Sequence, residues 1–273
     1  MPLCVKSSLD LAEESFVKPA NNDDGKTKYI TKVTFHEARH LLGASFAGTR
    51  EVKGEPTVSH WLLPPLKLSE KENIEIVTFF MSFVVAGNQA KKSKFFTKSV
   101  ANDKEHASLV GSVIVKESDP QHQESWLQKA LDKSRDLFVT YRLLLQGGVP
   151  DFFQSKDHKD NATKLEQCFG QWGKQAKAAH LEFGPSSKHW YVHVVGTHPA
   201  FQKQGHGSDL MTRISQLADE AQMECFLEAS QDNVEWYQKF GFKLVGTYEM
   251  VNPFDKSIPN SILYCMVRPV TAA

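Results

Sequence analysis

The chain has 273 residues, with 32 basic and 32 acidic side chains, so its formal net charge at pH 7 is zero. Binders of nucleic acid or of anionic membrane surfaces need a clustered positive surplus, and this balance argues against both classes. With 41% hydrophobic and 23% charged residues, the composition is that of an ordinary folded protein. The length allows one large domain or two small ones.

The cysteines and the apolar runs bear on the location of the protein. Its four cysteines, Cys4, Cys168, Cys225 and Cys265, lie far apart and form no Cys-x-x-Cys pair. This spacing suits neither a metal site nor a disulfide framework, so we expect free thiols in a reducing compartment. The N-terminus lacks the apolar run of a secretory signal, and the longest apolar stretch, 76–86, is too short to span a bilayer. We therefore expect a cytoplasmic protein without a membrane partner.

The first part of the chain predicts an arm, a strand and two helices. Residues 1–27 are polar and end in a turn cluster, which predicts a flexible N-terminal arm. A short β-rich run at 29–34 precedes a helical period over 36–47. A capping box at 69–72 then starts a second helix, which should end near Gly87.

The middle of the chain predicts a hairpin followed by a long helical segment. Two β-rich runs at 95–100 and 108–116 are joined by a polar turn, as in a β-hairpin. Residues 117–187 keep helical periods interrupted by glycine and proline. At about 70 residues this segment greatly exceeds an ordinary connection, so we expect a helical insertion.

The last third of the chain alternates between strands and helices. The expected elements are strand 190–195, helix 205–221, strand 225–229, helix 234–240, strand 242–250 and strand 262–267. A strand–helix–strand succession implies two parallel strands joined by a crossover helix. Together with the antiparallel hairpin upstream, this predicts an α/β fold with a mixed sheet.

A glycine-containing motif lies at the first strand-to-helix junction of this region. The sequence there is Gln202-Lys203-Gln204-Gly205-His206-Gly207, between strand 190–195 and helix 205–221. Glycines at such a junction let the backbone approach a ligand closely. The first N–H groups of the helix have no partner inside the helix and can bind an anion. The motif therefore predicts a phosphate site.

The motif and its surroundings resemble a known family. Gln-x-x-Gly-x-Gly in this position resembles the pyrophosphate-binding motif of the Gcn5-related N-acetyltransferases, the GNAT family. The preceding strand, 189–197, looks like the fourth strand of that family. The downstream block Leu227-Glu228-Ala229-Ser230-x-x-Asn233-x-x-x-Tyr237-x-x-x-Gly241-Phe242 resembles its second conserved block. The stretch 189–246 is also similar to the puromycin N-acetyltransferases.

The resemblance implies the domain organisation and the place of acetyl-CoA. The implied organisation is a single GNAT domain over 28–273, with 117–187 inserted between the third and fourth strands and an acetyl-CoA-binding core at 188–250. In the family, acetyl-CoA lies where the fourth and fifth strands splay apart. Strand amides would then meet the pantetheine, with Gly196 at a bulge or a close approach, and the helix start would hold the pyrophosphate. The implied contacts are Val194, Val195, Gly196, Thr197, Gln202, Lys203, Gln204, Gly205, His206, Gly207, Ser208 and Asn233.

The resemblance also implies catalytic residues. Acetylation of an amine needs a group that receives its proton and a donor for the leaving thiolate. Tyr237 matches the family's donor tyrosine, although packing against neighbouring phenylalanines is an alternative role. His193 and Glu228 are the two candidates for the base, and a relay from amine to water needs neither. Histone-type members use a glutamate on the fourth strand, which this chain lacks.

The resemblance implies an acetyl-CoA-dependent N-acetyltransferase that uses no metal. We expect the acceptor to be a primary amine of a small molecule, attacked directly in a ternary complex. A peptide or protein N-acetyltransferase and a non-catalytic CoA-binding protein remain alternatives. We expect the 117–187 insertion to form part of the acceptor pocket wall or a homodimer face.

Two further patterns have alternative interpretations. His36-Glu37-Ala38-Arg39-His40 matches the zinc peptidase motif His-Glu-x-x-His, but both histidines lie opposite the apolar stripe of their helix and no third ligand is marked. A basic cluster should lie on the solvated outer face of the hairpin, or contact the 3′-phosphate of CoA or an acidic acceptor. Its members are Lys91, Lys92, Lys94 and Lys98.

Overall fold

A computed structural model gives the fold of the chain over the following residues: 27–30, 51–52, 55–56, 93–101, 107–121, 125–126, 131, 134, 156–251 and 260–271. The predicted helices at 36–47 and 69–87 lie outside this part, as do most of the N-terminal arm and the His-Glu-x-x-His motif. Within it, no helix combines the length and the apolar character that crossing a membrane requires.

The described helices and strands follow the predicted order closely in the last third of the chain. The strands are β1 (Thr27–Ile30), β2 (Glu51–Val52), β3 (Glu55–Pro56), β4 (Lys94–Ala101), β5 (Ala107–Ser118), β6 (His189–Thr197), β7 (Cys225–Ala229), β8 (Lys243–Met250) and β9 (Ser261–Arg268). The helices are α6 (Lys156–Phe183), a 3-10 turn (Pro199–Phe201), α7 (His206–Glu220) and α8 (Gln231–Gln238). The predicted crossover helix is thus confirmed to within one residue at each end.

Among the described residues, the main sheet is mixed and has seven strands in the order β1-β4-β5-β6-β7-β9-β8. The antiparallel pairing of β4 with β5 confirms the predicted hairpin. The pair β6 and β7 is parallel, and α7 is the crossover between them. The last strand, β9, inserts between β7 and β8 and pairs antiparallel with both. The fold class is therefore the predicted α/β fold with a mixed sheet.

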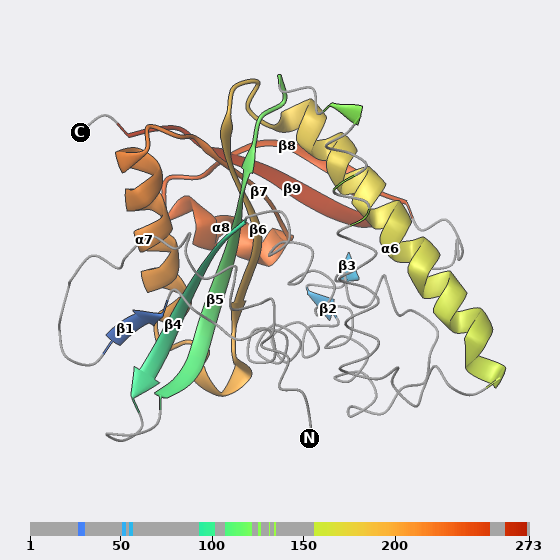
Figure 1. Cartoon of the computed structure of the whole chain (residues 1–273), viewed down its shortest axis with the longest axis horizontal. Coiled ribbons are helices and arrows are strands. Elements are labelled where there is room, and N and C mark those ends of the chain that lie inside the picture. The colour runs from blue at the N-terminus through green and yellow to red at the C-terminus, as the bar shows by residue number, and fades with distance from the viewer. Residues whose placement is uncertain are drawn as a thin grey trace, which may run out of the picture.

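Helices cover the two faces of this sheet, and Figure 1 shows α6 and α7 on opposite sides of it. On what we call the α7 face, α7 and α8 pack on alternate strand residues, in a core that includes Val113, Trp190, Val192, Leu210, Ile214, Leu227, Tyr237 and Phe242. On the α6 face, α6 packs on the intervening residues, in a core of Ala176, Ala179, Phe226, Met250, Leu263 and Cys265. Alternation along each strand thus separates two sets of side chains.

Strands β6 and β7 pair only at their beginnings. Their ladder consists of Trp190 with Cys225 and Tyr191 with Phe226, although both strands continue beyond these pairs. The register between β6 and β5 shifts so that His193 is the extra residue of a β-bulge. A bulge increases the local twist of a strand, which is consistent with β6 turning away from β7 here. Of the two roles expected for Gly196, the bulge is wrong, because Gly196 pairs in register with Ser112, and the close approach to the cofactor stays a prediction.

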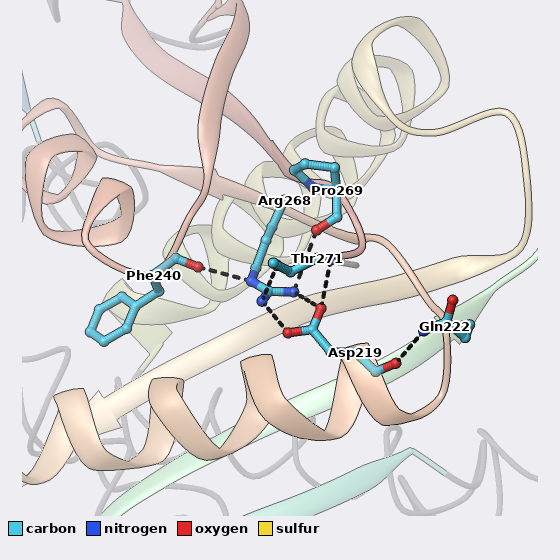
Figure 2. Close-up of polar contacts among 6 residues, drawn as sticks. All are labelled: Asp219, Gln222, Phe240, Arg268, Pro269 and Thr271. Atoms are coloured by element: carbon cyan, nitrogen blue, oxygen red, sulfur yellow. Dashed lines mark hydrogen bonds and ion pairs between the residues drawn. The ribbon is translucent and has the colours of Figure 1, made fainter. Parts of the chain in front are cut away.

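An ion pair at the far end of α7 ties the last strand to this layer. Arg268 of β9 donates to both carboxylate oxygens of Asp219, at 2.8 and 2.6 Å, and to the carbonyl oxygen of Phe240 at 2.9 Å (Figure 2). The same carboxylate accepts the N–H of Thr271 at 2.9 Å. These bonds fasten the end of α7, the segment after α8 and the end of β9 to one another.

The structure corrects the expectation for one lysine of the hairpin. Lys98 lies on β4 with only 4% of its surface exposed, and its ammonium forms an ion pair with Asp209 in the first turn of α7. It therefore does not lie on a solvated outer face, because α7 covers this part of the sheet. Lys91 and Lys92 lie outside the described residues, and the side chain of Lys94 is not described.

Candidate active site

The start of α7 presents unpaired backbone N–H groups. Gly205 is the N-cap, with a φ of 87°, and no side chain caps the helix. Lys203, two residues earlier, also has a positive φ of 60°. The first helical hydrogen bond joins Asp209 N–H to Gly205 O at 3.0 Å, so the N–H groups of the residues before Asp209 have no acceptor inside the helix. These groups and the positive end of the helix dipole can bind a pyrophosphate.

Gly207 lets three segments meet at this helix start. A Cβ atom at Gly207 would lie 3.2 Å from Thr197 Oγ1 on β6 and 3.4 Å from the Trp236 ring on α8. The Trp236 indole also donates a hydrogen bond of 3.3 Å to Ser208 Oγ. The end of β6, the first turn of α7 and helix α8 are therefore in direct contact, and a larger residue at Gly207 would push them apart.

Two glutamines of the motif are hydrogen-bonded to the backbone of the loop to which they belong. Gln202 donates to the carbonyl oxygen of Thr197, and Gln204 donates to that of Ala200, at 3.3 and 3.2 Å. The two side chains thus hold the loop that leads from β6 to α7. Both are exposed and close to the N–H groups at the helix start.

His206 contributes its backbone rather than its ring to this site. Both ring nitrogens are buried, and neither has a hydrogen-bond partner among the described residues. Burial and the nearby Lys98 ammonium lower the pKa of this histidine, so the ring is neutral at physiological pH. Asn233 is exposed at the start of α8, where its side-chain N–H₂ donates to Ser230 Oγ at 3.0 Å.

Tyr237 packs on the α7 face. Its ring makes edge contacts with Trp236 and Phe242, at centroid distances of 4.7 and 5.8 Å, and 8% of the residue is exposed. Burial raises the pKa of the Tyr237 phenol, and its hydroxyl has no hydrogen-bond partner in the part of the chain described. A hydroxyl without a partner on a buried ring fits a proton donor better than a purely structural residue.

Glu228 lies on β7 and faces the opposite side of the sheet. Its Oε2 accepts a hydrogen bond of 2.7 Å from the Tyr191 hydroxyl, whereas its Oε1 is buried and without a partner among the described residues. Burial raises the pKa of this carboxyl from its ordinary 4.5 to about 7, although the bond from Tyr191 acts in the opposite direction. A carboxylate that titrates near neutral pH is suited to general base catalysis.

His193, the bulged residue of β6, lies beside the same tyrosine. The His193 and Tyr191 ring centroids are 5.3 Å apart, and His193 is half-buried. The structure thus brings His193 and Glu228 together around Tyr191 on the α6 face, with Tyr237 on the α7 face. Sequence reasoning missed Tyr191, although its place two residues before His193 on a strand put it on the same face.

The candidate site carries no cluster of metal ligands. Across the described residues, no group of three or more histidine, cysteine, aspartate or glutamate side chains could hold a metal ion. His36 and His40 of the zinc peptidase motif lie outside those residues.

Known proteins resemble this chain in sequence and in fold. Residues 166–244 match the family model of the acetyltransferase (GNAT) domain. One similar solved structure is the histone acetyltransferase HPA2 and related acetyltransferase from Corynebacterium glutamicum, with 16% identity, a TM-score of 0.50 and coverage of 91% of this chain and 98% of that one. Another is arylalkylamine N-acetyltransferase 2 from Aedes aegypti, with 11% identity, a TM-score of 0.50 and coverage of 90% and 99%. No curated protein sequence matches the chain.

The matched segment includes most of α6, the strands β6 and β7 that splay, and the helices α7 and α8 at the candidate site. The strand order and the likeness to solved acetyltransferases extend the same fold over the rest of the sheet. Residues 166–244 therefore resemble a GNAT acetyltransferase domain, and the described sheet and helices share the fold of solved acetyltransferases.

Proposed function

We propose that this chain transfers an acetyl group from acetyl-CoA to a primary amine of a small molecule, by direct attack in a ternary complex. The observation that carries the proposal is the early end of the pairing between β6 and β7. On one side of this opening lie the free N–H groups of α7 and the buried Tyr237, and on the other lies the unpartnered oxygen of Glu228.

The residues around α7 fit the CoA part of this substrate. The N–H groups from Gly205 to Ser208 would bind the pyrophosphate, because no side chain caps them. The edge of β6 over Val194, Val195 and Thr197 would meet the pantetheine, since β7 does not pair with it there. Asn233 would meet the same arm from α8.

The proposed mechanism uses a base on the α6 face of the sheet, Glu228, and an acid on the α7 face, Tyr237. Glu228 takes a proton from the acceptor amine through Oε1, and the amine nitrogen forms a bond with the thioester carbonyl carbon. The bond from that carbon to sulfur then breaks, and Tyr237 donates its proton to the thiolate. Because burial keeps the Tyr237 phenol protonated well above neutral pH, it is available as an acid whenever Glu228 is available as a base. His193 is the second candidate for the base.

The position of α6 supports a small acceptor. Phe183, the last residue of this helix, packs so closely on β8 that a Cβ atom at Gly246 would collide with its ring. At Gln175, α6 is also hydrogen-bonded to the backbone of Val251, at 2.9 and 3.1 Å. A helix fixed at both points over this face leaves less room for an extended peptide than for a small amine.

The proposal is tested by a thiol-release assay with acetyl-CoA and a panel of arylalkylamines, polyamines, aminoglycosides and peptides. We expect release with at least one small amine, and an N-acetylated product by mass spectrometry. Release only with peptides would overturn the small-molecule acceptor. CoA binding by calorimetry together with a flat panel would contradict catalysis and favour a non-catalytic CoA-binding protein.

A further inference from the structure

A pair of histidines connects α6 to the Glu228 site. His180, in the last turn of α6, and His189, the first residue of β6, approach to 2.7 Å between their Nε2 atoms. His189 Nδ1 lies 2.7 Å from the carbonyl oxygen of Ser187, which can only accept. His189 therefore carries its proton on Nδ1, so its Nε2 accepts, and the bond between the rings requires the proton of His180 on Nε2.

Both histidines are neutral at physiological pH. The pKa of His180 is lowered to about 4 by burial, by His189 and by Lys116, and burial also lowers the pKa of His189. His180 therefore neither gains nor loses a proton where the enzyme would work. Its role at the site must come from its shape and its contacts.

The His180 ring is fixed against Phe226 and Tyr191. It stacks on the buried Phe226 ring at a centroid distance of 4.6 Å and an angle of 7°, and it lies 4.7 Å from the Tyr191 ring. The N–H of Gly184 donates to the carbonyl oxygen of His180 at 2.9 Å, and only glycine fits there, because a Cβ would collide with that oxygen. The turn after α6 thus locks His180 in place.

We propose that His180 is a positioning residue for acetyl transfer, which holds the Tyr191 ring so that its hydroxyl binds Oε2 of Glu228 and Oε1 stays available to the acceptor amine. The inference rests on the proposed role of Glu228 as the base. It assigns a part in catalysis to α6, the helix that precedes β6 and the glycine-containing motif.

Other titratable groups face the Glu228–Tyr191 pair from the surrounding elements. Cys265 of β9 is the register partner of Glu228, and burial raises the pKa of its thiol to about 12, so it stays neutral. Glu182 of α6 acts on Cys265, Lys116 of β5 acts on His180, and His193 of β6 contacts Tyr191. Because several of these groups can titrate, the pKa of Glu228 must be measured on its own carboxyl group.

The test measures the pKa of Glu228 by carboxyl ¹³C NMR and the pH profile of kcat/KM in a set of variants. Glu228→Gln identifies the resonance. Tyr191→Phe removes a hydrogen bond to the ionised carboxylate, so it should raise this pKa by about one unit. His180→Ala should raise it by about half a unit, and His180→Phe, which keeps a ring against Phe226 and Tyr191, should reverse most of that rise. Leu181→Ala, at an exposed neighbouring residue of α6, should leave it unchanged.

A double variant separates positioning from general loosening of the fold. If His180 acts through Tyr191, adding His180→Ala to Tyr191→Phe should cause no further shift in either readout. The proposal would be overturned if His180→Ala shifted the pKa of Glu228 equally in the wild type and in Tyr191→Phe. It would also be overturned if a folded His180→Ala protein showed no shift. If His180→Ala does not fold, His180→Leu, which fills the space without a ring or a donor, gives the same comparison against Tyr191→Phe. The NMR titration needs no turnover, so a failure of the proposed function in the amine panel is recognised separately.

Discussion

The Tyr191 hydroxyl donates a hydrogen bond of 2.7 Å to Oε2 of Glu228, so the last paired residue of β6 contacts a β7 residue two positions beyond the last pair. One oxygen of the carboxylate is thereby fixed, and the other is buried without a partner among the described residues. The arrangement produces an oriented carboxyl group with a pKa of about 7, beside the opening between the two strands.

Replacing Glu228 by glutamine should abolish most of the activity. The glutamine side chain can still accept the Tyr191 hydrogen bond but cannot take a proton, so we expect kcat/KM to fall by about 10²- to 10⁴-fold. In the wild-type protein, kcat/KM should rise with pH through about 7 as Glu228 ionises. Steady-state kinetics over the pH range measure both the loss of activity in the variant and the pH dependence of the wild type. A Glu228→Gln variant with the wild-type pH profile would move the base to His193 or to water.

The same substitution should stabilise the fold at alkaline pH. The pKa of Glu228 is raised on folding from 4.5 to about 7, so its contribution is fully present below the lower value and is lost as pH rises through the higher one. Removing the charge should therefore raise the free energy of unfolding at pH 8 by an amount on the order of 3 kcal/mol, with little effect near pH 4. Thermal melts at both pH values measure this. Glu220→Gln, at an exposed residue of α7, is the matched control.

Replacing Tyr237 by phenylalanine should lower kcat and leave acetyl-CoA binding intact. The ring would keep its contacts with Trp236 and Phe242, and the lost hydroxyl has no hydrogen bond among the described residues. We expect a loss of about 10- to 100-fold in kcat, the lower range for removal of a general acid. Calorimetry and thermal melts should match the wild type. Turnover unchanged across the pH range would leave Tyr237 with a packing role only.

Replacing Gly207 by alanine should weaken CoA binding. The added methyl group would lie 3.2 Å from Thr197 Oγ1 and 3.4 Å from Trp236, so the first turn of α7 must shift. A loss of about tenfold in affinity corresponds to about 1.4 kcal/mol and is the size we expect from misplaced N–H groups. Gly173→Ala is the control, since nothing lies within 4 Å of a Cβ there. It should leave CoA affinity unchanged and slightly stabilise α6.

Replacing Asp219 by asparagine should destabilise the fold. The Arg268 guanidinium belongs to a residue that is 6% exposed and would lose its charged partner, which costs about 3 kcal/mol when a buried pair is broken. Arg268 lowers the pKa of Asp219, so this stability is present at neutral pH and lost as pH falls through the lowered pKa. Urea unfolding at pH 7 should show a large difference, and this difference should shrink as the pH is lowered into the acid range. Arg213→Ala, which breaks the more exposed pair with Glu220, should change little.

The local features of the site were predictable from sequence, because they depend on neighbouring residues. The two glycines at the start of α7, the strand before it and the short helix after β7 all follow from patterns within a few residues. The opening between β6 and β7 entered only through the resemblance to a family, since strand pairing is decided by residues far apart in the chain.

The polar contacts of the site could not be predicted for the same reason. Lys98 and Asp209 are 111 positions apart, and nothing near Lys98 indicates that α7 covers it. The His180–His189 pair depends on the turn at Gly184, which reverses the chain after α6. The bulge at His193 rather than at Gly196 depends on the register with β5, which no single-strand pattern determines.

The most direct test of acetyl transfer varies acetyl-CoA and the best amine together and identifies the product by mass spectrometry. Direct attack in a ternary complex predicts intersecting double-reciprocal lines, an N-acetylated amine and no acetylated protein. Parallel lines with an acetyl group on the protein would indicate a covalent intermediate and contradict the mechanism. Acetyl-CoA that binds but yields no acetylated amine with any acceptor would contradict the function itself.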